Sequence, residues 1–260
     1  MSTQITTEQV KQLRDSTGVS VMQCKKALEE SEGDMEKALL ILKKKSTEIA
    51  AKKSDREATA GAVAKAQKEG MGLLLTLRCE TDFVAKNSDF TAVAETLAGI
   101  ALEKGKAEAE AQAPDLIGTA VQKLGENIQL GEIVTVEAPV IGSYVHDGRM
   151  GVIVGLTGGT EALAKDIAMH IAAMNPEYKT RADVPADASE KVKAMFAEEV
   201  AQSDRPQEIK DKMLAGKIDT FFKERTLSDQ SFIKNPDQTI EALLKANGAT
   251  LVDFVRVATT

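Results

Sequence analysis

Residues 72–77 read Gly-Leu-Leu-Leu-Thr-Leu, and this short apolar run decides the fold of the chain around it. Its length and the glycine before it predict a buried β-strand rather than a helix. Residues 92–98 read Ala-Val-Ala-Glu-Thr-Leu-Ala, and their apolar positions have helical spacing within a predicted helix over about 89–104. The basic unit of the fold is therefore expected to be a strand followed by a covering helix.

A second copy of this unit is expected further along the chain. Residues 151–156 read Gly-Val-Ile-Val-Gly-Leu, and residues 162–168 read Ala-Leu-Ala-Lys-Asp-Ile-Ala. The match indicates two related subdomains, with shared composition as the alternative explanation. The loop between the matched blocks covers residues 78–91 in the first copy and only 157–161 in the second. A loop that is longer than its counterpart is a candidate for function.

Three short helices are predicted over residues 6–45, before this core. Each has a capping signal at its start, in the pairs Thr6 and Gln9, Ser20 and Gln23, and Gly33 and Asp34. Residues 46–70 are rich in Ala, Lys and Glu and predict a helical or partly flexible connector.

The remaining elements follow from turn signals and periodicity. Asp147-Gly148 lies between two apolar runs and predicts a β-hairpin. Two helical stripes between 187 and 225, joined at residues 204–206, fit an antiparallel hairpin that resembles a coiled coil. Further helices are predicted over about 115–127, 160–174 and 238–247, and further strands over 133–136 and 251–257.

The predicted fold class is α+β. The N-terminal three-helix module and the start of the connector occupy residues 1–54. A two-part core follows, with its first subdomain at 55–139 and its second at 140–260. The antiparallel helical hairpin is expected as an insertion at about 184–230.

Composition narrows the class of protein. The net charge of −7 lowers the expectation of nucleic-acid binding, because such proteins neutralise phosphates with Lys and Arg. No apolar stretch is long enough for a membrane span and no signal peptide is evident, so a cytoplasmic protein is expected. The spacing of two cysteines and two histidines does not match a zinc site. Phosphate-binding glycine motifs are missing from the sequence, so no metal, cofactor or direct nucleotide binding is expected.

The long first loop carries Glu-Thr-Asp-Phe-Val-Ala-Lys-Asn at residues 80–87. Phe83 beside Asp82 is unusual for a turn. Either the ring stands out from the loop for a partner, or it folds back and packs beneath the loop. The sequence leaves both interpretations open.

Three motifs resemble signatures of the elongation factor Ts family. They are Thr-Asp-Phe-Val-Ala-Lys at 81–86, Thr-Gly-Val-Ser-Val-Met-Gln-Cys-Lys-Lys-Ala-Leu at 17–28, and Ile-Ala-Met-His-Ile-Ala-Ala at 167–173. The stretches 125–128 and 142–144 are also similar, and the resemblance runs in order over nearly the whole chain. It implies a ubiquitin-associated-like N-terminal module, a two-part α+β core and an inserted helical hairpin.

The resemblance implies a non-enzymatic exchange factor that binds GDP-bound elongation factor Tu, releases GDP and stays bound until GTP binds. Phe83 would act as an apolar wedge, and Asp82 would disturb groups that hold the partner's magnesium. Thr81 and Val84 would set the shape of the loop. The other expected partner contacts are Arg14, Val21, Met22, Ala85, Lys86, Asn87, His146, Met169 and His170.

Alternative interpretations accompany these residues. Val21 and Met22 would otherwise pack in the core of the small module, and His170 would be a satisfied core histidine. An enzyme using Cys79, His170 and Asp82, a nucleotide-binding protein and a bare adaptor are the rival functions. The stoichiometry of the complex, one-to-one or two-to-two, and homodimerisation are left open. Many family members continue with a C-terminal module that also touches the GTPase, and the end of this sequence at Thr260 puts that contact in doubt, although the core wedge does not depend on it.

Overall fold

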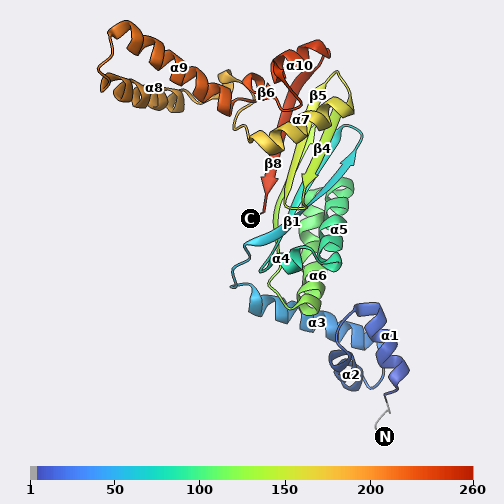
Figure 1. Cartoon of the computed structure of the whole chain (residues 1–260). Helices are drawn as coiled ribbons and strands as arrows, with labels where there is room; N and C mark the ends of the chain where they lie inside the picture. The colour runs from blue at the N-terminus through green and yellow to red at the C-terminus, as the bar shows by residue number, and fades with distance from the viewer. Residues whose placement is uncertain (1–4, 260) are drawn as a thin grey trace.

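The computed structural model describes residues 5–259, so that the outermost parts of the predicted divisions, residues 1–4 and 260, lie outside it. Within the described residues, ten α-helices and eight strands form an elongated molecule (Figure 1). The strands form two three-stranded sheets and one two-stranded sheet, all with antiparallel pairing. The α+β class predicted from the sequence is confirmed.

The N-terminal helices are α1 (Thr7–Thr17), α2 (Val21–Glu30) and α3 (Met35–Lys53). Thr6 and Gln9 form the predicted capping box, whereas Ser20 accepts only the backbone N–H of Gln23, so that the second box is half formed. Gly18 ends α1 in the left-handed conformation, at φ 66°. The helices share a small core of Leu13, Val19, Cys24, Ala27, Leu28, Ala38 and Leu42.

Helix α3 also joins this unit to the rest of the chain. Its buried Ser46 lies against α6, where a Cβ added at Gly118 would be 3.2 Å from the Ser46 hydroxyl oxygen. Lys43 and Asp115 form an ion pair at 2.7 Å between the same two helices. The helix is therefore shared between the N-terminal unit and the core.

The predicted connector is wrong for residues 60–68, which form strand β1 (Ala60–Lys68). Composition rich in Ala and Lys favours a helix, but burial decides this segment. Ala62, Val63 and Ala64 are buried, and the whole strand pairs with β2 from Ala60 opposite Cys79 to Lys68 opposite Met71. Tertiary pairing outweighs local propensity here.

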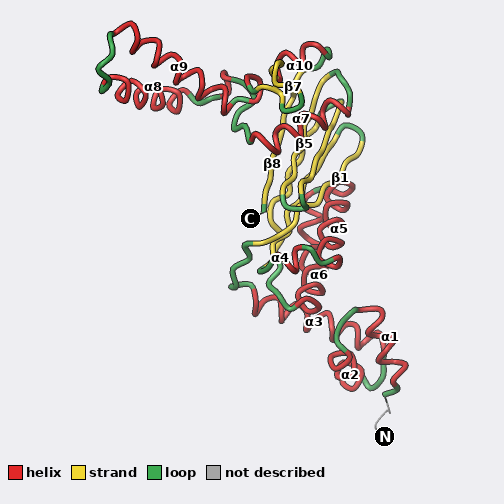
Figure 2. Tube along the Cα trace, viewed as in Figure 1, coloured by secondary structure: helices red, strands yellow, loops and turns green. Residues whose placement is uncertain are grey.

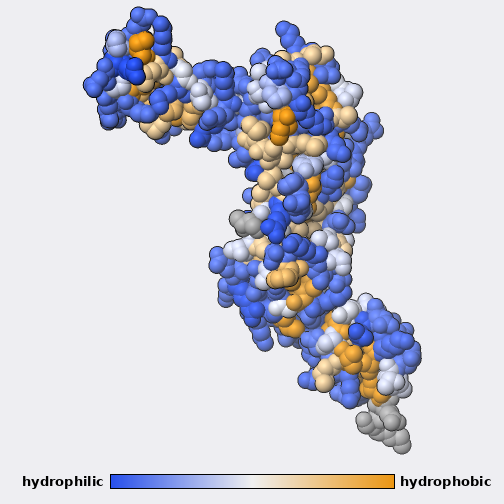
Figure 3. Space-filling model, viewed as in Figure 1, coloured by the Kyte–Doolittle hydropathy of each residue, from blue (hydrophilic) through white to orange (hydrophobic). Residues whose placement is uncertain are grey.

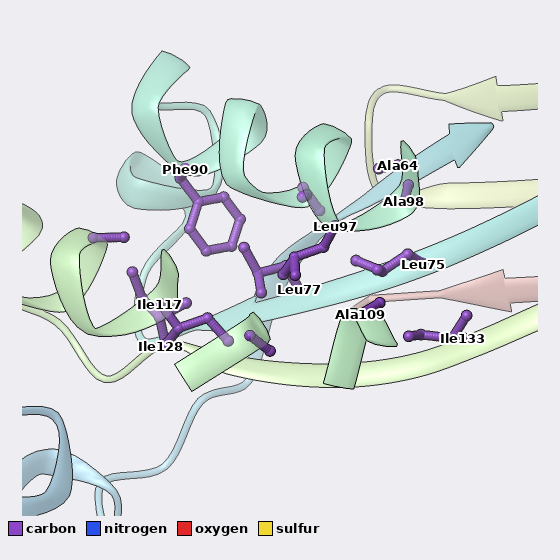
Figure 4. Packing of buried hydrophobic residues seen from close by; sticks show 14 of the residues in the cluster. Ala64, Leu75, Leu77, Phe90, Leu97, Ala98, Ala109, Ile117, Ile128 and Ile133 are labelled. Atoms are coloured by element: carbon purple, nitrogen blue, oxygen red, sulfur yellow. The ribbon is translucent and has the colours of Figure 1, made fainter. Parts of the chain in front are cut away.

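The first sheet has the order β1-β2-β3, and two helices cover one of its faces (Figures 1 and 2). Its elements are β2 (Met71–Cys79), β3 (Gln129–Glu137), α4 (Asp82–Ala85), α5 (Ser88–Lys104) and α6 (Lys106–Leu124). Leu75 and Leu77 point from the sheet toward Phe90 and Leu97 of α5 (Figure 4). Helix α6 begins nine residues before the predicted start at 115, because Pro114 lies inside it rather than ahead of it.

The second sheet repeats this topology in the order β4-β5-β8. Its strands are β4 (Val140–His146), β5 (Met150–Thr157) and β8 (Thr250–Ala258), and it is covered by α7 (Glu161–Met174) and α10 (Ile240–Ala246). Asp147 and Gly148 have φ of 49° and 69°, as a type I′ turn requires, so the predicted hairpin is confirmed. In both sheets a hairpin, a covering helix and a third strand beside the middle strand occur in the same order, which supports the proposed repeat.

The two sheets pack against each other through their uncovered faces. Leu74 and Ile153 are fully buried there, on the opposite side of each middle strand from the covering helices. A Cβ added at Gly72 would lie 2.8 Å from Ile153, and one added at Gly151 would lie 2.8 Å from Leu74. A Cβ at Gly155 would lie 2.8 Å from Val136. The glycines therefore set how closely the sheets approach.

Two helices leave this core as an arm (Figure 2). They are α8 (Ala186–Ala201) and α9 (Gln207–Arg225), and they pack side by side with Phe196 and Phe221 edge to face. At the base of the arm, Arg181 bonds to Asp219 of α9 and to Asp229. A small sheet of β6 (Ser231–Phe232) and β7 (Asn235–Thr239) follows the arm. No strand or turn pattern in the sequence predicts this small sheet.

Gly142 of β4 tests the packing of α7 on the second sheet. A Cβ added there would lie 2.3 Å from the Ala164 carbonyl carbon, so Gly142→Ala must push strand and helix apart. We expect a loss of about 2 kcal/mol in the free energy of unfolding, within the usual range for overpacking. Gly99→Ala on α5 is the matched control, because no described residue beyond its own helical neighbours lies within 4 Å of the added Cβ. It should stabilise the protein by about 0.5–1 kcal/mol. Urea unfolding followed by circular dichroism measures both, and equal effects would contradict the assigned packing.

Candidate functional site

The long loop between β2 and α5 holds one helical turn, α4. Thr81 caps it, because its hydroxyl oxygen accepts the backbone N–H of Val84 at 3.4 Å. Ala85 is buried in the first core and Val84 packs against that core, whereas the Phe83 side chain is 84% exposed. The interpretation that Phe83 packs beneath the loop is therefore wrong, and the ring stands in water on an anchored turn.

Glu126 holds the start of this turn. Its carboxylate accepts the backbone N–H of Glu80 and of Thr81, each at 3.0 Å, and the Thr81 hydroxyl at 2.6 Å. In the other direction, the Glu80 carboxylate accepts the backbone N–H of Asn127 at 2.6 Å. Four hydrogen bonds thus join the segment before α4 to the segment after α6.

Charge also concentrates at this loop. The Asn127 N–H, together with the Arg56 guanidinium 3.4 Å away, holds the pKa of the Glu80 carboxyl below its ordinary value, so that Glu80 stays ionised. Asp82 lies 3.5 Å from the Lys86 ammonium and 3.7 Å from the Arg149 guanidinium. Such half-exposed pairs contribute less than about 1 kcal/mol each. A partner can therefore displace them at low cost.

Arg149 brings the second sheet to the loop. It follows the β4–β5 turn, and in that turn the Gly148 carbonyl accepts the Val63 N–H of β1 at 2.7 Å. Thr259, just after β8, donates its N–H to the Arg149 carbonyl at 2.8 Å. The candidate site is consequently built from both halves of the core.

A second group of predicted residues lies on the other half of the core. His146 is exposed, and its Nδ1 lies 2.9 Å from the Tyr144 hydroxyl. His146 and Met169 line one hollow together with Tyr144 and Ile233. The structure brings these two predicted residues together.

His170 lies inside the protein. Its Nδ1 accepts the N–H of Ile233 at 3.2 Å, so its Nε2 donates to Gln230 at 2.9 Å. Burial lowers the pKa of the imidazole, which keeps it neutral. A direct partner contact, as the resemblance implied, does not fit a side chain with no exposed surface.

The N-terminal helices carry a third exposed surface. Val21 is 53% exposed and Met22 is 65% exposed, so the interpretation that they pack in the module's core is wrong. Arg14 is exposed on α1, and Leu40 of α3 is also exposed. Figure 3 shows apolar side chains gathered over these helices, away from α4 in Figure 1. Contiguous exposed apolar side chains are typical of a protein-binding surface.

Cys79, the proposed nucleophile of an enzyme, is sealed at the end of β2. Its thiol donates to the Thr81 carbonyl at 3.1 Å. Burial, reinforced by the negative charge of Glu126, raises the pKa of the thiol to about 12. His170 instead lies on α7 and bonds to Gln230, so the structure does not assemble Cys79, His170 and Asp82 into a catalytic group.

Among residues 5–259, no group of His, Cys, Asp and Glu side chains is arranged to hold a metal ion. None of the helices in that range has the length and apolar character that crossing a membrane requires.

Three side chains of the loop site, Glu80, Glu126 and Arg149, and the backbone N–H of Asn127 could not be predicted from the sequence as participants. Residues 125–128 were noted as resembling the family, but nothing in their composition points to a loop 45 residues earlier. The only local signal is Gly125, whose left-handed conformation, at φ 81°, ends α6 and turns Glu126 toward the loop. Long-range contacts of this kind do not follow from spacing.

An exposed aromatic ring on a braced turn, together with two further exposed surfaces, is typical of a protein that acts by contacting another protein. Comparison with known proteins narrows this class. The family described as "Elongation factor TS" matches residues 80–260. The chain belongs to the elongation factor Ts family.

Individual relatives are similar in sequence to this chain over almost its full length. The elongation factor Ts of Alkalilimnicola ehrlichii is 44% identical over 95% of this chain and 89% of its own length. That of Marinobacter nauticus is 42% identical over 97% of this chain and 90% of its own. That of Alcanivorax borkumensis is 41% identical over 95% and 92%. The similarity therefore covers the N-terminal helices as well as the core.

The state of Cys79 can be tested directly. Both cysteines are buried, and the Cys79 thiolate is disfavoured until the pH approaches about 12. At pH 8, a thiol-reactive dye should label neither cysteine of the folded protein within minutes and both after addition of denaturant. Absorbance of the released dye measures this. Rapid labelling of one thiol in the folded protein, identified as Cys79 by mass spectrometry, would contradict the sealed site.

Proposed function

We propose that this chain is a guanine nucleotide exchange factor that binds GDP-bound elongation factor Tu and promotes the release of GDP. Membership of the elongation factor Ts family supports the partner and the process. The observation that carries the mechanism is the 84% exposure of Phe83 on a turn whose neighbours are anchored. A ring kept out of its own core is available to enter another protein.

In this proposal Phe83 is an apolar wedge. Burying a phenylalanine side chain in a partner is worth about 1.5–3 kcal/mol. This energy is available only when the partner opens a cleft to admit the ring. The exchange factor then binds the opened partner more tightly than the GDP-bound form. By linkage, GDP binds the complex more weakly by the same factor.

The magnitude is sufficient for exchange. Weakening GDP binding by about 100-fold requires roughly 2.7 kcal/mol, since each tenfold change is ~1.36 kcal/mol. Asp82 lies beside the ring and is held only by the weak pairs with Lys86 and Arg149. We propose that it disturbs the groups that hold the partner's magnesium, which weakens the hold on the nucleotide phosphates. No covalent step is needed.

The remaining surfaces are assigned to the same partner. Arg14, Val21 and Met22, on a module of ubiquitin-associated type, would contact its nucleotide-binding domain. His146 and Met169 would contact another domain, with the buried His170 fixing α7 behind them. Lys86 and Asn87 flank the wedge, and the buried Ala85 anchors it.

The finer organisation also belongs to the proposal. It includes the divisions at 1–54, 55–139 and 140–260, the arm as an inserted coiled-coil hairpin, a cytoplasmic location and a complex that persists until GTP binds. A bare adaptor is the second candidate, favoured by the exposed apolar residues of the N-terminal helices. An adaptor would bind the same partner without changing how fast the nucleotide leaves.

Stopped-flow measurement with fluorescent GDP distinguishes the two. Catalytic amounts of this protein should accelerate the release of labelled GDP from elongation factor Tu by at least tenfold over the spontaneous rate. The wedge mechanism requires this acceleration, whereas binding without acceleration would leave only the adaptor.

Phe83→Ala isolates the wedge. The side chain is exposed, so the free energy of unfolding should change by less than about 0.5 kcal/mol. Catalysed GDP release should fall by tenfold or more, because the energy of burying the ring in the partner is lost. Val252→Ala, an exposed apolar residue of β8, is the control and should leave release unchanged. Unchanged release by the Phe83 variant would disprove the wedge.

A further inference from the structure

We infer that Glu126 is a positioning residue. It holds residues 80–85, the wedge turn that carries Phe83, in the conformation that presents the ring before the partner arrives. The inference rests on the proposed exchange function for its biological meaning. Its physical content, an ordered turn that depends on one carboxylate, can be measured without the partner.

The turn cannot hold itself. Helix α4 has four residues, and an isolated turn of this length is unstable because nucleation costs more than one hydrogen bond returns. Phe83 gives it no support, since the ring contacts water rather than the core. The buried Ala85 fixes the end of the turn. Its beginning therefore needs an anchor from elsewhere in the chain.

Glu126 supplies that anchor at the place where the sheet stops. Pairing of β2 with β1 ends at Cys79 opposite Ala60, so the next two backbone N–H groups have no strand partner in this ladder. One oxygen of Glu126 accepts both of them, at 3.0 Å each. Backbone donors next to a core must be bonded, and here a single carboxylate bonds two in succession.

The second carboxylate oxygen of Glu126 orients the Thr81 hydroxyl that caps α4. It accepts the Thr81 hydroxyl at 2.6 Å, and the same hydroxyl oxygen accepts the Val84 N–H. The hydroxyl proton therefore points to Glu126 and leaves a lone pair for the turn. Glu126 consequently selects the Thr81 rotamer that caps α4, two residues before Phe83.

Glu126 is itself held rigidly. Gly125 ends α6, and the Lys53 ammonium donates to its carbonyl. Asn127, only 2% exposed, donates its backbone N–H to the Glu80 carboxylate at 2.6 Å. A carboxylate on a fixed backbone can impose its geometry on a short turn. Such preorganisation lowers the cost of ordering the wedge when it binds.

If Glu126 only stabilised the fold, its loss would resemble the loss of a buried polar side chain nearby. Asn127 provides the matched control for this alternative. The Asn127 side chain lies in the same turn and is buried, but it bonds to residues 54 and 56 rather than to the wedge turn. Asn127→Ala should therefore lower stability without loosening the wedge. Glu126→Gln should retain function, because its amide oxygen can accept both N–H groups while its NH₂ donates to the Thr81 oxygen.

Hydrogen exchange of the free protein tests whether the hydrogen bonds from Glu126 hold the wedge turn in place. The backbone amides of residues 80–84 should exchange at least tenfold faster in Glu126→Ala than in wild type. Their exchange rates should be unchanged in Asn127→Ala. Unaltered protection in Glu126→Ala would overturn the inference. This measurement involves no partner, so its outcome is independent of whether the chain accelerates GDP release.

The rate of catalysed GDP release then tests whether Glu126 positions Phe83. Glu126→Ala should reduce catalysed release about tenfold, Glu126→Gln less than threefold, and Asn127→Ala less than twofold. In a Phe83→Ala background, Glu126→Ala should reduce the remaining release less than twofold, because no wedge is left to position. An equal reduction with and without Phe83 would overturn the positioning role. If the wild-type protein does not accelerate GDP release, the exchange function is wrong. The amide protection still decides whether Glu126 orders the wedge turn.

Discussion

The close approach of the two sheets is the constraint on which the rest of the structure depends. Each sheet has one face covered by helices, and the other face must be buried against its counterpart. Gly72, Gly151 and Gly155 leave room for the opposing side chains, at distances that a Cβ would not allow. Because the sheets approach so closely, Gly148 in the turn of one half bonds to Val63 of β1 in the other, and Arg149 after the turn pairs with Asp82 of α4. The loop that carries Phe83 is therefore supported by both halves.

This support explains how an apolar ring can remain in water. A phenylalanine on a mobile loop would gain energy by folding onto the nearest apolar surface. Here the turn is bonded at one end through Glu126 and buried at the other through Ala85, so the ring has no freedom to return. The charged side chains of Glu80, Asp82, Lys86 and Arg149 lie around the same loop. Exposure of the ring is a product of rigidity rather than of weak packing.

Much of the fold could be predicted from the sequence, and the failures have physical causes. The strand at 72–77, the hairpin at Asp147-Gly148 and the helices of the core follow from periodicity and turn chemistry. Strand β1 was missed because its alanines and lysines favour a helix until β2 provides a partner. The loop was recognised as a candidate from its length and its Phe83. The support from Glu126 could not be predicted, because its contact with Thr81 spans 45 residues and produces no periodic pattern in the sequence.

Helix α3 has a consequence for the geometry of binding. It contains 19 residues, which corresponds to a length of about 28 Å at 1.5 Å per residue. One end belongs to the N-terminal unit and the other is packed on α6. The helix thus acts as a fixed spacer between the exposed apolar surface that includes Met22 and the core that carries the exposed Phe83. A rigid spacer suits only partners whose own sites lie at the matching separation, and attachment at one site raises the local concentration of the other. Recognition then depends on molecular dimensions as well as on side-chain chemistry.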